Sequence, residues 1–265
     1  MRLSSDERGE LGYAKSLLEN PGLAAKITNV IGAPVERGFA LLPAKWSDAV
    51  NRATRAALWK ALDAAVATVG DNGPRRSADV LHRMLVAATG ATGGAFGLPA
   101  LLVELPISTT IMLRSIVDVA RSQGERIKEL ETKLACIEVF ALGGPSKRDD
   151  AAETGYFAVR AALATTVSEA AQYIAERGLA QEGAPALVRF IAQVAARFGV
   201  VVSEKAAAQA VPIIGAVGGA AVNLIFIKHF QDMARGHFIV RRLERAHGQD
   251  VVRAEYETMV ARKAE

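Results

Sequence analysis

The sequence predicts an all-α fold, a compact helical domain, and three observations support this prediction. Alanine dominates the hydrophobic residues, which make up 51% of the chain, and alanine has the highest helix propensity. Apolar residues recur at helical spacing, most clearly on the face of Trp46, Val50, Ala53 and Ala57. Alternating runs rich in valine, isoleucine and threonine, which are typical of strands, are nearly absent. The 265 residues suffice for one large helical domain or two smaller ones.

Turn and capping signals place the predicted helices in order. Ser4 or Ser5 can cap a first helix with acidic residues in its first turn. Residues 23–42 are interrupted by glycine and proline and predict short helical pieces. A longer helix starts at Trp46, and later helices end at Gly143, at Gly178 and near Gly248. Between the last two, Pro185 stands at a first-turn position that proline favours.

Two long uncharged segments organise the rest of the chain. Residues 84–103 lead into an apolar helical arm, and residues 206–227 form a second arm, each rich in glycine and alanine. A shift of 114 residues places Arg114, Asp118 and Arg121 on Lys228, Asp232 and Arg235. We therefore expect two related halves, at about residues 46–145 and 151–247, inside a helical domain spanning 46–247. Residues 1–45 are expected to form an N-terminal helical segment, and residues 248–265 a C-terminal tail helix.

The glycines in the arms have a spacing that allows two helix backbones to touch. These close-packing candidates are Gly93, Gly97, Gly215 and Gly219. The same spacing suits a tight soluble bundle, a shallow or conditional membrane insertion, or two stable membrane spans, and all three stay open. Leucine, isoleucine, phenylalanine and valine favour insertion into a membrane by only about 0.3–0.6 kcal/mol each. When the unfavourable polar residues are added, the total free energy of inserting an arm is near zero.

Charged residues at the base of each arm share one helix face, because they are spaced at i, i+4 and i+7. The two sets are Arg114, Asp118 and Arg121, and Lys228, Asp232 and Arg235. They predict either a structural ion-pair clasp or a ligand site for an anion. Glu104 and Glu138 stand in apolar surroundings, so each must pair with a cation, such as an arginine, or serve a function.

Trp46 and Trp59 accompany two arginines, Arg52 and Arg55, on one predicted helix. Tryptophan favours the interface between water and lipid, so these four residues are candidates for contact with a membrane or a protein partner. The alternative is a partly buried tryptophan that packs under an arginine. The formal net charge of +4 suits an anionic membrane surface or a nucleic acid.

Sequence motifs for catalysis are absent from the chain. It has no HExxH, GxSxG, Walker A or dinucleotide fingerprint, so we predict no catalytic residue, no metal site and no cofactor. The basic residues are scattered, and no nucleic-acid partner is expected. The single cysteine, Cys136, fits a reducing compartment, and the charged N-terminus is unlike a signal peptide.

Four segments resemble the EcsC family of bacterial proteins, namely residues 97–121, 136–144, 153–164 and 211–244. The most specific is 211–244, which reads VPIIGAVGGAAVNLIFIKHFQDMARGHFIVRRLE. The family is named for a protein encoded beside an ABC transporter, so the resemblance implies a cytoplasmic or membrane-associated bacterial protein. It implies no set of catalytic residues.

Two functional hypotheses follow. The first is a non-enzymatic accessory protein, cytoplasmic and peripheral to the inner membrane, that contacts a membrane surface or a membrane protein, such as an ABC transporter, through its arms. The second is a soluble enzyme or ligand-binding protein with a site between the halves. Residues that would line that site are Glu104, Asp118, Glu138, His229 and Asp232.

Overall fold

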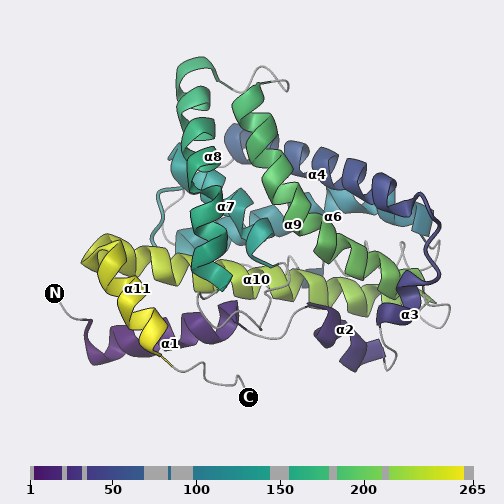
Figure 1. The fold of residues 1–265 in the computed structure, drawn as a ribbon, viewed down its shortest axis with the longest axis horizontal. Helices are drawn as coiled ribbons and strands as arrows, with labels where there is room; N and C mark the ends of the chain where they lie inside the picture. Colours follow the sequence, from purple (N-terminus) through teal and green to yellow (C-terminus); the bar gives the residue numbers. More distant parts are fainter. Residues whose placement is uncertain are drawn as a thin grey trace.

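The computed structural model is built from helices and confirms the all-α prediction for the residues it describes. These are residues 3–19, 23–31, 35–68, 83–84, 98–143, 155–178, 184–210 and 215–259. Ten helices and no strands are found in this described part of the chain. Figure 1 shows that they form one layered bundle around a single long helix.

The chain begins with three short helices. They are α1 (Ser5–Leu18), α2 (Leu23–Ile31) and α3 (Val35–Phe39). Ser4 caps α1 as predicted: its hydroxyl accepts a hydrogen bond from the Glu7 amide at 3.3 Å, and the Glu7 carboxylate accepts one from the Ser4 amide at 2.8 Å. The prediction of short pieces across residues 23–42 is confirmed by α2 and α3.

Longer helices follow. They are α4 (Trp46–Thr68), α6 (Leu98–Ser122), α7 (Leu130–Leu142), α8 (Gly155–Arg177) and α9 (Pro185–Ala210). Gly124 follows α6 with a φ of 78°, and Gly178 follows α8 with a φ of 70°. Positive φ angles suit glycine because it has no Cβ, so both residues stop their helices, and the stop at Gly178 confirms the prediction.

The longest helix is α10 (Gly215–His247), with 33 residues. It runs along the molecule and packs against α1, α2, α6, α7 and α9 (Figure 1). Gly248, with a φ of 88°, separates it from α11 (Gln249–Thr258). Helices α1 and α11 lie together under one end of α10, and α3 lies near the other end.

The described residues of the second apolar arm belong to two helices. Its residues 206–210 end α9, and residues 215–227 begin α10. Residues 211–214, which separate the two segments in the sequence, fall outside the described residues. The first arm continues from Leu98 into the motif of Arg114 as the single helix α6.

Helices α6 and α10 pack against each other, which brings the two arms together near the centre of the bundle. The buried Gln231 amide donates a hydrogen bond of 2.8 Å to the Ser115 hydroxyl, so the two charged motifs lie side by side. Gly219 is buried in α10, whereas Gly93 and Gly97 fall outside the described residues. The relation of the two halves by a repeat stays a prediction.

The core is lined by aromatic rings from α7, α9 and α10. Phe140 lies 4.9 Å from Phe198 and 5.3 Å from Phe230, measured between ring centroids. Residues from the ends of the chain share this core, including Leu11 of α1, Ile27 of α2 and Tyr256 of α11. The proposed division into residues 1–45, 46–247 and 248–265 also stays a prediction.

Candidate functional site

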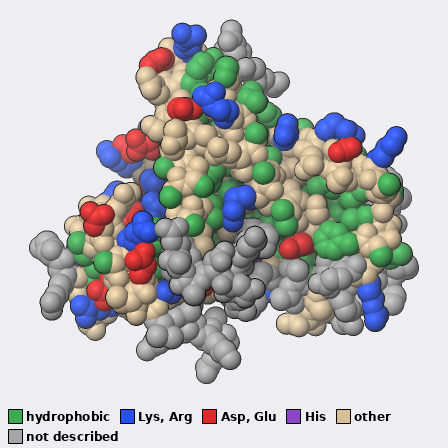
Figure 2. Space-filling model, viewed as in Figure 1, with side chains coloured by type: hydrophobic (Ala, Val, Ile, Leu, Met, Phe, Trp, Pro, Cys, Tyr) green, Lys and Arg blue, Asp and Glu red, His purple; other side chains and the backbone are tan. Residues whose placement is uncertain are grey.

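Several exposed hydrophobic side chains belong to the segments at one end of the bundle, namely α3 with the residues after it, the C-terminal half of α9 and the N-terminal halves of α6 and α10. We call this surface the apolar end, and its residues are Phe39, Leu41, Val103, Ile107, Val200 and Leu224. Val103 is 72% exposed and Ile107 is 48% exposed, although both belong to the apolar arm of α6. Figure 2 shows hydrophobic side chains on the right of the view, where Figure 1 has α3 and the neighbouring ends of α9 and α10.

Each arm carries a basic residue at the base of its outward face. On α6, Val103, Ile107 and the exposed Arg114 are spaced at i, i+4 and i+11, which returns to nearly the same angle. On α10, Leu224 precedes Lys228 by one turn, and the Lys228 side chain is 61% exposed. On both helices, a basic residue therefore comes after the exposed apolar side chains of the apolar end.

The tryptophan and arginine candidates on α4 divide between core and surface. Arg52 and Arg55 are exposed, and Trp59 is half-buried against the core. Trp46 is only 8% exposed and belongs to the core, so its indole is not presented to a partner in this conformation. The two arginines and Trp59 stay candidates for contact with a membrane.

Glu104 is buried beneath the apolar end in an ion pair with Lys205. The two carboxylate oxygens lie 2.9 Å and 3.0 Å from the lysine Nζ, and Asn223 donates a further hydrogen bond of 2.9 Å to Oε1. Burial lowers the pKa of Lys205, while the charge of Glu104 opposes that shift. The triad joins α6, α9 and α10.

Sequence reasoning expected an arginine partner for Glu104 and missed both of its partners. Lys205 is 101 residues away in sequence and Asn223 is 119 residues away. The sequence did contain a signal for both partners. Lys205 is the last charged residue before the uncharged residues 206–227, and Asn223 is the lone asparagine among them.

Glu138 lies in a different cluster, near the C-terminal half of α10. Burial raises its pKa to about 7, although Arg160 and Arg241 oppose the shift. Arg160 bonds both oxygens of Glu244, at 2.7 Å and 2.9 Å, and the Tyr156 hydroxyl lies 3.0 Å from His237 Nδ1.

The structure does not bring Glu104 and Glu138 together. Their neighbours on α10, Asn223 and Arg241, are 18 residues apart in the sequence. That separation corresponds to about 27 Å along a helix. The two acids therefore cannot line one small-molecule site between the halves.

The charged motifs pair within their own helices. Asp118 lies 3.0 Å from Arg121 on α6. Asp232 of α10 is buried and lies 3.0 Å from Lys228 and 4.0 Å from Arg235. His229 is buried beside this second motif, and its Nε2 lies 2.9 Å from the Gly143 carbonyl oxygen.

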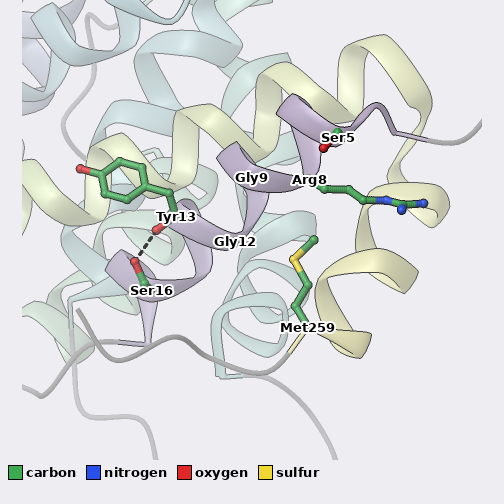
Figure 3. A pocket seen from close by; sticks show the side chains of 7 residues that line it. All are labelled: Ser5, Arg8, Gly9, Gly12, Tyr13, Ser16 and Met259. Atoms are coloured by element: carbon green, nitrogen blue, oxygen red, sulfur yellow. Dashed lines mark hydrogen bonds between the residues drawn. The ribbon is translucent and has the colours of Figure 1, made fainter. Parts of the chain in front are cut away.

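A separate groove of about 490 Å³ lies between α1 and the end of α11 (Figure 3). Its lining residues are Ser5, Arg8, Gly9, Gly12, Tyr13, Ser16 and Met259. The only charged side chain among them, Arg8, is paired with Glu255 at 3.0 Å. The groove therefore combines glycines and serines with the larger side chains of Tyr13 and Met259, and its lining residues include no group that is poised for chemistry.

Two further searches concern the described residues alone. Among them no group of three or more histidine, cysteine, aspartate or glutamate side chains is placed to hold a metal ion. One helix in that part of the chain, α9, has the length and composition of a membrane span, and half of the relevant stretch is buried in the bundle. Core helices of soluble proteins share these properties.

Comparison with known proteins identifies one family. The profile described as the EcsC protein family matches residues 13–243, which is most of the chain. No curated protein and no solved structure matches the chain.

Proposed function

The chain belongs to the EcsC protein family, and we propose that it is a non-enzymatic accessory protein that docks its apolar end on the cytoplasmic face of a bacterial membrane, beside a membrane protein such as a transporter. The observation that carries the proposal is the exposure of apolar side chains at this end, followed by Arg114 and Lys228. A surface of this kind can bury its apolar side chains among lipid headgroups while its cations contact anionic lipids.

The dimensions of the two outward faces support shallow docking. A helix rises 1.5 Å per residue, so Lys228 lies about 6 Å along α10 from Leu224, and Arg114 about 10 Å along α6 from Ile107. Amphipathic surface helices enter the boundary between headgroups and acyl chains by about 5–10 Å. Apolar side chains can therefore reach this boundary while both cations stay among the headgroups.

Vesicle co-sedimentation tests the proposal. The protein is mixed with phosphatidylcholine vesicles with and without phosphatidylglycerol, at low and high salt. We expect binding to the anionic vesicles that weakens as salt rises, because each well-placed cation contributes about 1 kcal/mol. Replacing Arg55 and Trp59 together should further weaken binding to the anionic vesicles.

A matched pair of variants tests the location of the surface. Val103→Glu with Ile107→Glu places two acids on the apolar end at exposed positions, so the fold should survive and binding should be lost. Val188→Glu is the control, because Val188 is an exposed valine of α9 outside the apolar end. The proposal fails if the protein ignores anionic vesicles at low salt, or if both variants bind as the unmodified protein does.

A further inference from the structure

A small cavity of about 210 Å³ lies where α8 meets the C-terminal end of α10 and the start of α11. Glu244 of α10 lines it, and Glu244 is 20 residues after Leu224 of the apolar end. That separation corresponds to about 30 Å along a helix. The cavity is therefore well separated from the surface proposed for docking on a membrane, and any ligand that it holds needs its own explanation.

Arg160 is the fixed cation of this cavity. Its Nη1 and Nη2 atoms donate to the two oxygens of Glu244, at 2.7 Å and 2.9 Å, and Nη1 also donates to the Tyr156 hydroxyl at 3.3 Å. The side chains of Arg160 and Glu244 are only 15% and 7% exposed. The Tyr156 hydroxyl is held in turn by His237, whose Nδ1 lies 3.0 Å away. These contacts with α8 and α10 fix the orientation of the guanidinium before any ligand arrives.

The contacts of Arg160 occupy only one edge of its guanidinium. Arginine has five N–H donors, and a second pair of parallel donors is formed by Nε and Nη2. Among the described residues no group accepts a hydrogen bond from Nε, and this atom is not enclosed by the protein. The second edge can therefore donate two hydrogen bonds to the oxygens of a carboxylate that enters the cavity.

An acid lines the same cavity without a partner of its own. Asp250, in the first turn of α11, is exposed and forms no ion pair or hydrogen bond with another described side chain. Arg253, the remaining charged residue of the lining, already pairs with Glu257 at 2.7 Å. The cavity therefore combines one cationic edge with one unpaired carboxylate, and this combination complements a ligand that carries both charges.

The rest of the wall is apolar and small. Ala161 and Ala164 line the cavity from exposed positions of α8. The guanidinium carbons of Arg160 and Arg253 lie 5.8 Å and 5.7 Å from the centroid of the Phe157 ring. The volume of about 210 Å³ is below the range of about 300–1,000 Å³ that is typical of pockets for larger ligands. These properties suit a small molecule with a short apolar group.

We propose that this cavity binds a free α-amino acid with an apolar side chain. Its carboxylate accepts two hydrogen bonds from Nε and Nη2 of Arg160, and its ammonium group pairs with Asp250. Its side chain packs on the two alanines of α8. Glu244 supports the site by holding Arg160, because an arginine that is already ordered loses less entropy when the ligand binds. The proposal concerns binding alone and goes beyond the membrane function, on which it does not depend.

Isothermal titration calorimetry with three related probes tests the proposal. L-leucine carries both charges, 4-methylpentanoate lacks the ammonium group, and 3-methylbutylamine lacks the carboxylate. Titrations that reach about 10 mM detect a Kd of about 1 mM. We expect leucine to bind, and each truncated probe to bind at least about tenfold more weakly, because each of them loses charge-assisted hydrogen bonds.

Two variants at exposed positions locate the site. Asp250→Asn removes the acid, and Ala164→Leu fills the cavity. Their matched controls are Asp48→Asn, at another exposed acid in the first turn of a helix, and Ala162→Leu, at an exposed alanine of α8 that does not line the cavity. Circular dichroism confirms that each variant is folded. Leucine binding should weaken by about tenfold or more in the first two variants and stay unchanged in both controls.

Three results would overturn the proposal. The site is absent if leucine does not bind at concentrations up to about 10 mM. If either truncated probe binds as tightly as leucine, one charge is enough and the ligand is not recognised as an amino acid. If leucine binding survives either Asp250→Asn or Ala164→Leu unchanged, the ligand lies elsewhere. Vesicle binding is measured separately, so failure of the amino acid site leaves the membrane proposal standing, and failure of docking leaves the site standing.

Discussion

Replacing Lys205 by methionine should strongly destabilise the protein, because it leaves the Glu104 carboxylate buried without its counter-ion. The ammonium group is fully buried and bonds both carboxylate oxygens, and only Asn223 would remain as a partner. Breaking a buried pair by removing one partner costs about 3–5 kcal/mol. In a chain of this size 1 kcal/mol corresponds to about 2–4 °C, so the melting temperature should fall by about 6–20 °C.

Urea and thermal unfolding, followed by circular dichroism, measure the effect. The double variant Glu104→Gln with Lys205→Met should recover most of the loss, because no charge is then buried and the glutamine still accepts from Asn223. Arg189→Met is the matched control: it breaks the pair with Glu169, in which both side chains are well exposed. Exposed pairs contribute about 0–1 kcal/mol. If Lys205→Met were as mild as Arg189→Met, the carboxylate would have access to water and the account of a dry ion pair would be wrong.

Two further predictions concern packing and pH. Gly38→Ala should lower stability by at least about 1–3 kcal/mol, because its Cβ would lie 1.8 Å from the Ala207 carbonyl oxygen of α9. Gly9→Ala, whose Cβ would meet nothing within 4 Å, should instead stabilise α1 by about 0.5–1 kcal/mol, and denaturant melts of both variants check the contrast. For Glu138, burial raises the pKa from 4.5 to about 7, so the folded protein holds a proton that the unfolded chain releases in this window. This contribution to stability is lost as pH rises from 4.5 to about 7, so the unmodified protein should lose up to about 3 kcal/mol of unfolding free energy relative to Glu138→Gln across that range. Melts of both proteins at several pH values measure the difference. If the stability of the two proteins changes equally with pH, the pKa of Glu138 is not raised.

Features that depend on neighbours in the sequence were predicted well. The Ser4 cap, the helix start at Pro185 and the stop at Gly248 are each decided within a few residues, and all are confirmed. The sequence also placed Trp46, Val50, Ala53 and Ala57 on one helical face; Ala53 is partly buried against the core and the other three are buried. That face predicted the environment of Trp46 better than the general preference of tryptophan for interfaces did.

Features that depend on the folded bundle could not be read from the sequence. Glu104 finds Lys205 because α6 and α9 meet, and no local pattern reports which helices pack together. Lys26 joins the motif of Asp232 only because α2 lies against α10. The sequence identified the charged motifs but not the further cation that α2 adds beside one of them.

Docking and insertion make different demands on α9. The helix has 26 residues and is apolar enough to span a bilayer, but Arg197 stands near its middle and donates a 2.9 Å hydrogen bond to the Ala141 carbonyl oxygen. Moving an arginine to the bilayer centre costs about 2.5–3.5 kcal/mol on an insertion scale. Insertion would also separate Lys205 from Glu104 and leave that carboxylate without its counter-ion. Contact through the exposed side chains of the apolar end breaks neither interaction. The buried polar contacts of α9 therefore favour an intact bundle over insertion of this helix into a bilayer.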